Sequence, residues 1–403
     1  MKFINSIKLT TINYYYSITV LIYFCAIYLP FIRVGLAMSL IMGYGIFILY
    51  KNKKLNLRKG LDVLVLIYLV YNLLTIFFYL FSEIPLSVFF REFSNSILPI
   101  IPFYFFGRLN YDNSFFKITS YSIAGCFAVG FYYQLSLPMN YMERLHVMEG
   151  SGKNPLGYLN YRTFLGVTAT GSLGAISMFL LFNSSLKDNS KFAKIFFVIC
   201  TLGVILSFRR AALYSSCFAI IFLNIFLLLK SKRRFFKLFI YEFLIMGLVI
   251  YWTINTYPEF LSSLLERFNS LSSAIAERSD SWFEGLSNTT SIITGDGLGK
   301  YGHKVVEFSD LSIPDGNYFR MIAEIGILGF LIFVSIISTA IYKGFLKIRT
   351  HYVQLIVIFI ICLQSVGSDL FSFQLVAPIF WYSIGACNKL HHPPGKKELK
   401  QTN

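Results

Sequence analysis

Apolar stretches of the length of a membrane span recur along the whole chain and are separated by shorter polar segments. A helix needs roughly 17–25 mainly apolar residues to cross the hydrocarbon core of a bilayer. A membrane β-barrel would show short alternating segments instead. The pattern therefore predicts an all-α integral membrane protein with about twelve transmembrane helices. We place these helices at residues 11–32, 34–50, 61–81, 93–107, 118–137, 161–182, 195–208, 211–229, 238–254, 319–342, 352–367 and 373–387.

Composition supports this class of protein. The 403 residues are 56% hydrophobic and 14% charged, whereas soluble domains are nearer 45–50% apolar and about 25% charged. No small-residue cleavage site follows the first apolar run, which therefore reads as a span and not as a removed signal. The six cysteines lie in apolar stretches without a CxxC pair, which favours core packing over a disulfide or a zinc site. We expect one polytopic membrane domain over residues 1–403.

The distribution of positive charge predicts the topology. If both termini are cytoplasmic, most lysines fall on the cytoplasmic side, as the positive-inside rule requires. This N-in, C-in arrangement leaves two sizeable outer loops, a smaller one at 138–160 and a large one at 255–318, between the ninth and tenth spans. The net charge of +16 thus reports topology, and we expect no nucleic acid partner.

The basic residues on the outer side are mostly arginines. Nine of these twelve residues are arginine, among 36 Lys and Arg in the chain. Arginine binds phosphate and carboxylate in a planar, bidentate way, so this preference indicates anion recognition. Arg209 and Arg210 lie between two spans with almost no loop. They either snorkel to the membrane boundary or hold an anion in an outer cavity, and we favour the second interpretation. Arg162, at the start of the sixth span, is either an interfacial anchor or a ligand contact.

The large outer loop carries two further polar segments. The stretch AIAERSDSWFEGLSN predicts a short amphipathic helix on which Arg278 shares a face with Trp282. Arg278 either pairs with Glu277 or Asp280 at the surface or binds a ligand.

Asp315, Asn317 and Tyr318 immediately precede the tenth span, where Asp315 or Asn317 is also suited to cap the helix. Arg320 and Glu324, four residues apart, are expected to pair. The glycine-rich GLGKYG matches GxGxxG, but no strand precedes it, so turns that fold the loop back are the better interpretation.

Three segments carry a resemblance to a known family. LSFRRA at 206–211, RSDSWFEGLSNTTSIITGDGLG at 278–299 and PDGNYFRMIAEIGILG at 314–329 resemble, in the same order, characteristic segments of the O-antigen ligase and polymerase superfamily of bacterial envelopes. The similarity extends over most of the chain, including the large outer loop. Asp315 stands where ligases of this family carry histidine and polymerases more often carry aspartate.

The resemblance implies a metal-independent membrane glycosyltransferase that needs no cofactor. It would polymerise undecaprenyl-pyrophosphate-linked oligosaccharide repeat units, as donor and acceptor, into O-antigen or a related surface polysaccharide. Its location would be the bacterial inner membrane, with an active site facing the periplasm. Membrane lipids surround such an enzyme, and a chain-length regulator and a flippase are possible partners.

The resemblance also suggests residue roles. Asp315 would act as the catalytic base, and Arg210 and Arg278, with Arg162 in support, would bind pyrophosphate. Asn317 and Tyr318 would orient sugar hydroxyls. Two alternatives stay open: a ligase that transfers glycan to lipid A core or to protein, and a lipid-linked oligosaccharide flippase or other transporter. Repeat symmetry between two halves would favour the transporter.

Overall fold

Helices follow one another along the chain in the computed structural model, which describes residues 14–29, 34–51, 57, 60–80, 82–109, 114–136, 163–188, 190–207, 209–230, 271–302, 305–308, 312–313 and 315–389, with scattered positions between 239 and 255. No strand occurs among these residues. The helices are α2 (Tyr15–Tyr28), α3 (Val34–Lys51), α4 (Leu61–Leu74), η1 (Thr75–Tyr79), α5 (Leu86–Glu92), η2 (Phe93–Ile97), α6 (Ile100–Leu109), α7 (Ser114–Ser136), α9 (Val167–Asp188), α10 (Lys191–Leu206), α11 (Arg210–Lys230), α14 (Leu271–Ser287), α15 (Asn317–Leu346), α16 (Ile348–Gln364) and α17 (Ala377–Cys387).

These helices confirm the predicted all-α membrane class. Within the described part of the chain, five helical stretches are long and apolar enough to span a bilayer: Val34–Lys51, Leu61–Tyr79, Thr168–Leu186, Arg210–Leu228 and Asn317–Leu346. Described helices overlap eleven of the twelve predicted spans, whereas most of 238–254 lies outside the described residues. How many of these helices cross a membrane, and in which direction, stays a prediction.

The centre of the bundle is the closely packed pair α6 and α17. A Cβ placed on Gly107 would lie 2.1 Å from the Tyr382 carbonyl oxygen, and one on Gly385 would lie 2.0 Å from that of Tyr104. The two backbones therefore touch at both glycines, a common way for apolar helices to associate through small residues.

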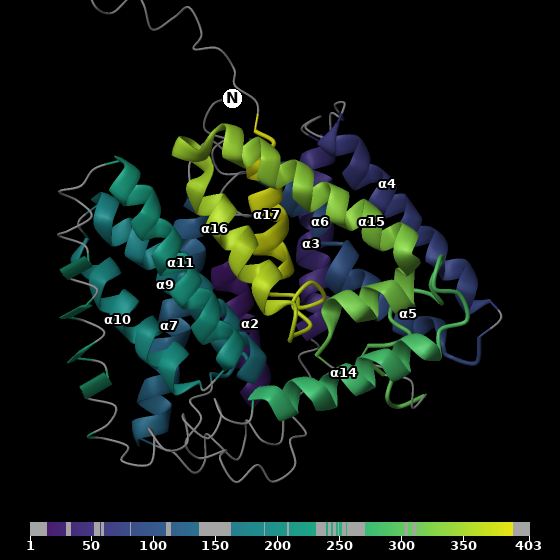
Figure 1. Ribbon diagram of the computed structural model, residues 1–403, viewed down its shortest axis with the longest axis horizontal. Helices are drawn as coiled ribbons and strands as arrows, with labels where there is room; N and C mark the ends of the chain where they lie inside the picture. The colour runs from purple at the N-terminus through teal and green to yellow at the C-terminus, as the bar shows by residue number, and fades with distance from the viewer. Residues whose placement is uncertain are drawn as a thin grey trace, which may run out of the picture.

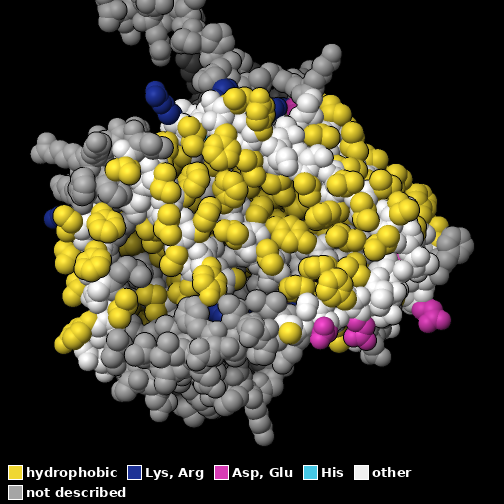
Figure 2. Space-filling view, in the orientation of Figure 1, with side chains coloured by type: hydrophobic (Ala, Val, Ile, Leu, Met, Phe, Trp, Pro, Cys, Tyr) yellow, Lys and Arg dark blue, Asp and Glu magenta, His cyan; other side chains and the backbone are white. Residues whose placement is uncertain are grey.

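The surface seen in Figure 2 carries a broad apolar band with charged side chains at its edges. Large side chains of this kind are exposed on α15, for example Leu328, Leu331 and Phe345. Such an exposed apolar area is expected of a protein surrounded by lipid. In Figure 1, α14 lies across the end of the bundle opposite the junction of α15 and α16. This end carries the candidate site.

Candidate anion-binding and catalytic site

Three arginines from two segments of the chain line one polar pocket. Arg209 lies in the turn between α10 and α11, Arg210 is the first residue of α11, and Arg278 lies on α14. The pocket has a volume of about 80 Å³. Its remaining lining comes mainly from the start of α9 and from the turn after α16, through Thr168, Ser172, Ala211, Ala212, Gly367 and Ser368. Guanidinium groups and hydroxyls are the donors that a phosphate-type anion needs.

Local packing explains how the arginines reach this pocket. The Arg209 backbone N–H donates to the Ser207 Oγ at the end of α10, at 3.4 Å, which helps to form the tight turn. A Cβ on Gly171 would lie 2.9 Å from the Arg209 Cβ, so α9 can approach this turn only because residue 171 is glycine. Gly367 similarly faces the Arg278 guanidinium, at 3.5 Å from a Cβ placed there.

The structure brings Asp315 to the same place. Its Oδ2 lies 3.2 Å from the Arg278 Nη2, and the two side chains are 35% and 38% exposed. Asp315 has a φ of 54°, the left-handed conformation that aspartate tolerates better than most residues. Arg278 thus pairs with Asp315, an acid from outside its own helix that the sequence did not suggest as its partner, and both residues lie beside the pocket.

A stacked aromatic pair holds α14 in position. The rings of Trp282 and Phe319 are stacked with centroids 4.9 Å apart, and Trp282 is buried. The predicted amphipathic helix and its docked Trp282 face are therefore confirmed. A Cβ on Gly316 would lie 2.4 Å from the Trp282 Nε1, so the segment before α15 packs directly under this ring.

The glycine cluster of the large loop packs against a break in α15. Gly326 has φ 68° and ψ 173°, which interrupts the helix. The loop satisfies the freed backbone groups. Asp296 N–H donates to the Ala323 oxygen at 3.0 Å, and Gly297 N–H donates to the Glu324 oxygen at 2.8 Å. In the other direction, Ile327 N–H donates to the Ile292 oxygen at 2.9 Å.

The close packing of this loop on α15 accounts for the glycines of the cluster, and no bound phosphate is needed to explain them. A Cβ on Gly295 would lie 2.5 Å from the Glu324 backbone, and one on Gly326 would lie 2.2 Å from the Ile293 oxygen. The Asp296 carboxylate fixes the loop by accepting from Tyr301 Oη at 2.6 Å and from Thr290 N at 3.0 Å. Burial raises the pKa of the Tyr301 hydroxyl, which therefore stays a donor. The loop folds back as expected, and it packs against the break in α15.

Arg320 organises a buried ionic cluster close to the break. Its Nε lies 2.8 Å from Glu324 Oε1, and its Nη2 lies 2.6 Å from Glu92 Oε1. Its Nη1 contacts Asp369 and also donates to Ser372 Oγ at 3.1 Å. The predicted Arg320–Glu324 pair is confirmed. Sequence reasoning missed Glu92 and Asp369 as partners because they come from distant parts of the chain.

Asn317 and Tyr318 bind protein groups and do not line the arginine pocket. In the orientation that satisfies its neighbours, the Asn317 side-chain oxygen accepts from Phe371 N at 2.8 Å and from Leu370 N at 3.0 Å. The Tyr318 hydroxyl donates to the Cys362 carbonyl at 2.8 Å. Both residues thus anchor the segment around Gly367 and Ser368, which does line that pocket. Their predicted contact with sugar hydroxyls stays a prediction.

Some sequence predictions fall outside the described residues. Arg162 is one of these, and so are the smaller outer loop at 138–160 and residues 256–270 of the large loop. Sequence reasoning did not single out Thr168, Ser172 and Ser368, because isolated hydroxyl residues at helix ends carry no distinctive spacing. Only the folded chain shows that they meet the arginines.

Comparisons with known proteins add no family assignment. No protein-family model matches the chain, and no curated protein sequence matches it. The functional interpretation therefore rests on the site itself and on the resemblance of the three segments.

Proposed function

We propose that this chain is an integral-membrane glycosyltransferase that joins undecaprenyl-pyrophosphate-linked oligosaccharide repeat units into a surface polysaccharide. The observation that carries the proposal is the convergence of Arg209, Arg210 and Arg278 on one pocket with Asp315 beside it. A pyrophosphate leaving group needs fixed cations, and an attacking sugar hydroxyl needs a nearby base. This site offers both at the end of a membrane bundle.

Each of these residues has a separate role in the proposed reaction. Arg210 and Arg278, with Arg209, hold the donor pyrophosphate and stabilise the charge that grows on it as its bond to the sugar breaks. Asp315 takes the proton of the acceptor hydroxyl as the new glycosidic bond forms. Undecaprenyl pyrophosphate then leaves with the bonding electrons. Arg162 is proposed to support the pyrophosphate, and Asn317 and Tyr318 to orient sugars or hold the pocket wall.

The proposed setting is the bacterial inner membrane with this site on the periplasmic side. Twelve spans with both termini in the cytoplasm and the large loop at 255–318 complete the proposed topology. No cofactor or catalytic metal enters the reaction as written. The described residues contain no group of three or more His, Cys, Asp or Glu that fits a metal ion.

The direct test supplies purified protein with lipid-linked repeat units and no nucleotide. We expect a ladder of polymer lengths on a gel. In a parallel reaction with lipid A core added as the acceptor, transfer of glycan to that core would indicate the ligase instead. No transfer at all by folded protein would reject a glycosyltransferase.

A transporter of lipid-linked oligosaccharides is the second candidate, because one observation favours it. Transporters place substrate and ion sites at broken membrane helices, and α15 is broken at Gly326. The two functions differ in the effect of Arg210→Ala in cells. Loss of transport keeps lipid-linked units on the cytoplasmic side, whereas loss of polymerisation leaves single units displayed outside.

The ion pair between Asp315 and Arg278 predicts that these two residues have opposite effects on anion binding. Arg278 cannot bind an anion fully while it is paired with Asp315, so Asp315→Asn should tighten binding. A partly exposed ion pair contributes about 0.2–1 kcal/mol, so the expected gain in affinity for inorganic pyrophosphate is up to about fivefold. Arg278→Ala should weaken the same binding.

Titration calorimetry of the full chain in detergent measures both variants. Asp280→Asn is the matched control, because Asp280 is an exposed acid on the same helix as Arg278, and it should leave the affinity unchanged. Equal affinities in wild type and Asp315→Asn would contradict competition between Asp315 and the anion.

A further inference from the structure

The loop at 291–300 runs beside two long apolar helices and contacts each of them well away from its nearest end. Tyr71 on α4 donates its hydroxyl hydrogen to the Thr294 carbonyl at 3.3 Å, and Tyr79 in η1 donates to the Leu298 carbonyl at 2.7 Å. On its other side, the loop pairs with the break in α15 at Gly326, inside the stretch Asn317–Leu346. The loop is therefore inserted between the two helices.

The contacts on α4 and η1 place this loop within the thickness of a bilayer. The stretch Leu61–Tyr79 is apolar enough to span a membrane and has 19 residues. At 1.5 Å per residue its length is roughly 28 Å, close to the hydrocarbon core of about 30 Å, so nearly all of it is needed to cross. Tyr71 then lies roughly 15 Å from the Leu61 end, and Tyr79 roughly 27 Å. The loop thus lies at the depth of one leaflet, the outer one in the predicted topology.

The backbone groups that the helix break frees have partners in this loop. An unbroken α15 would pair the Ile327 and Leu328 N–H groups with the Ala323 and Glu324 carbonyls. Here all four groups bond to residues of the loop instead, at 2.8–3.3 Å. Non-helical backbone is tolerated at membrane depth only where the protein satisfies its polar groups. The loop and the break together meet this condition, which a loop in water does not have to meet.

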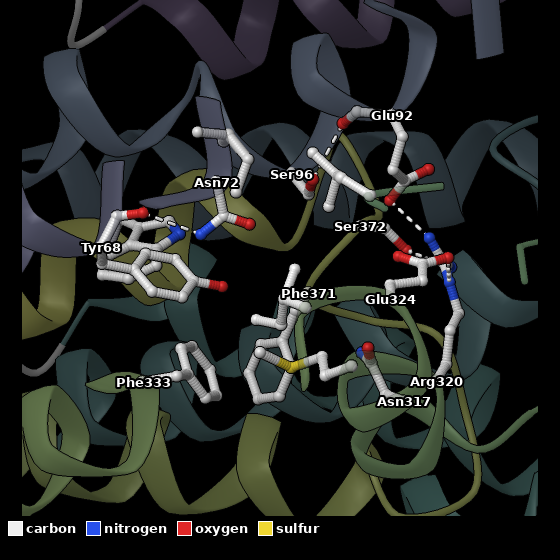
Figure 3. A pocket seen from close by; sticks show the side chains of 15 residues that line it. Tyr68, Asn72, Glu92, Ser96, Asn317, Arg320, Glu324, Phe333, Phe371 and Ser372 are labelled. Atoms are coloured by element: carbon white, nitrogen blue, oxygen red, sulfur yellow. Dashed lines mark hydrogen bonds and ion pairs between the residues drawn. The ribbon is translucent and has the colours of Figure 1, made fainter. Parts of the chain in front are cut away.

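Charged side chains next to the break point into the protein. Figure 3 shows Arg320 directed toward Glu92 and Glu324, with dashed lines that join it to both. These three side chains are 5% exposed or less. In the loop itself, the Asp296 carboxylate accepts from Tyr301 Oη at 2.6 Å. These charges are therefore paired inside the protein, as charges at membrane depth usually are.

The side chains that residues 291–300 expose are two isoleucines. Ile292 and Ile293 are 46% and 59% exposed, whereas Gly295 and residues 297–299 are buried. Their carbonyls accept from Ile327 and Leu328, which are exposed on α15 just after the break. The two isoleucines therefore extend the exposed apolar surface of α15, which already suits a lipid environment.

We propose that residues 291–300 form a re-entrant segment of the membrane domain, with Ile292 and Ile293 in contact with the acyl chains of membrane lipids. The large loop at 255–318 then contains a segment that returns into the bilayer. Lys300, whose Nζ donates to the Phe78 carbonyl at 3.0 Å, lies where the segment leaves the acyl region, since lysine extends its amine to the membrane edge. The segment fixes the depth of the half-helix that follows Asp315, and this placement does not depend on the proposed reaction.

The test labels the wild-type chain in liposomes of phosphatidylethanolamine and phosphatidylglycerol. A trifluoromethyl phenyl diazirine, which partitions into the acyl region, is activated by light, and peptide mass spectrometry locates the inserted reagent. Such an apolar reagent prefers the acyl region to water by about tenfold or more, so labelling of Ile292 and Ile293 should exceed that of Ser287 by this factor. Ser287 is an exposed polar residue at the end of α14. Leu331, exposed on α15, should be labelled as strongly as the isoleucines.

A second measurement identifies what the isoleucines contact. The variant Ile293→p-benzoylphenylalanine is reconstituted as the full chain in the same liposomes and irradiated. Its intact mass should increase by that of one phospholipid, as it should for the same substitution at Leu331. The same substitution at Ser287 is the matched negative control and should give no lipid adduct. Ile292 is the alternative position if the first variant does not fold.

Two results would overturn the proposal. The first is labelling of Ile292 and Ile293 no stronger than that of Ser287, because the segment would then face water or lie under another part of the chain. The second is a crosslink from position 293 to protein instead of lipid. Wild-type protein alone decides the first. Arg278→Ala should keep the wild-type labelling even if it loses all activity, so failure of the proposed function and failure of the re-entrant segment are distinguishable.

Discussion

Replacing Arg278 or Arg210 by alanine should reduce polymer formation by about 10²–10³-fold in kcat, the loss of about 2.7–4 kcal/mol that follows removal of one preorganised donor to a developing anion. Both arginines line the same pocket, so the double variant should lose less than the product of the single losses. Arg278→Lys should recover only part of the activity, since lysine keeps the charge but not the bidentate geometry.

Rates of polymerisation from lipid-linked repeat units, measured on gels over a range of substrate concentrations, give these values. Arg349→Ala is the control, because Arg349 is exposed near the start of α16, away from the pocket-lining turn that follows the end of this helix. Its activity should match that of the wild type. The Tm of Arg278→Ala should stay within about 1–2 °C of the wild type, since Arg278 is more than one third exposed and such surface changes have small effects.

Normal turnover by folded Arg278→Ala would show that the pyrophosphate binds elsewhere. The arginine pocket would then no longer support the proposed function. If Asp315→Asn alone stays active, the arginine pocket keeps its role and the base must be another acid. These two results separate the binding of the leaving group from the activation of the acceptor.

The sequence predicted those features of the site that depend on local spacing. The Arg320–Glu324 pair follows from residues four apart on a helix, and the docked face of α14 follows from Trp282 four residues after Arg278. Both are set by helical periodicity, which is read directly from the chain.

Features that depend on packing between distant segments were not predictable in this way. The partner of Arg278 is Asp315, and Arg320 binds Glu92 and Asp369, because α14, α5 and the turn after α16 pack around the start of α15. The glycine cluster predicted turns, but nothing in its own sequence identified Gly326 as the position against which it packs. Side-chain spacing contains no information about such contacts until the helices are placed.

Gly326→Ala should be among the most destabilising single substitutions in this protein. Position 326 has a positive φ, and its Cβ would lie 2.2 Å from the Ile293 oxygen. Overpacking costs about 1–3 kcal/mol, and a strained backbone conformation costs about 1–3 kcal/mol more. We therefore expect a loss of roughly 3 kcal/mol or more, visible as a lower Tm and a lower yield of folded protein in detergent.

Gly43→Ala is the matched control, because Gly43 lies in α3 and a Cβ there meets nothing within 4 Å. Its effect should be neutral or stabilising by about 0.4–1 kcal/mol. Gly295→Ala tests the other side of the same contact. Gly295 has a φ of 74°, and its Cβ would lie 2.5 Å from the Glu324 backbone, so its loss of stability should be similar to that of Gly326→Ala.

Alanine also favours helical φ and ψ, so the Gly326→Ala chain has one way to avoid the clash, which is to make α15 continuous. The Ala323 and Glu324 carbonyls would then accept from their own helix, and the Asp296 and Gly297 N–H groups would lose their present partners. The loop at 292–297 would detach from the half-helix that follows Asp315. Such a protein should be inactive and more readily cleaved by protease in this loop. A Gly326→Ala variant with wild-type Tm, activity and protease resistance would show that the break does not position the site.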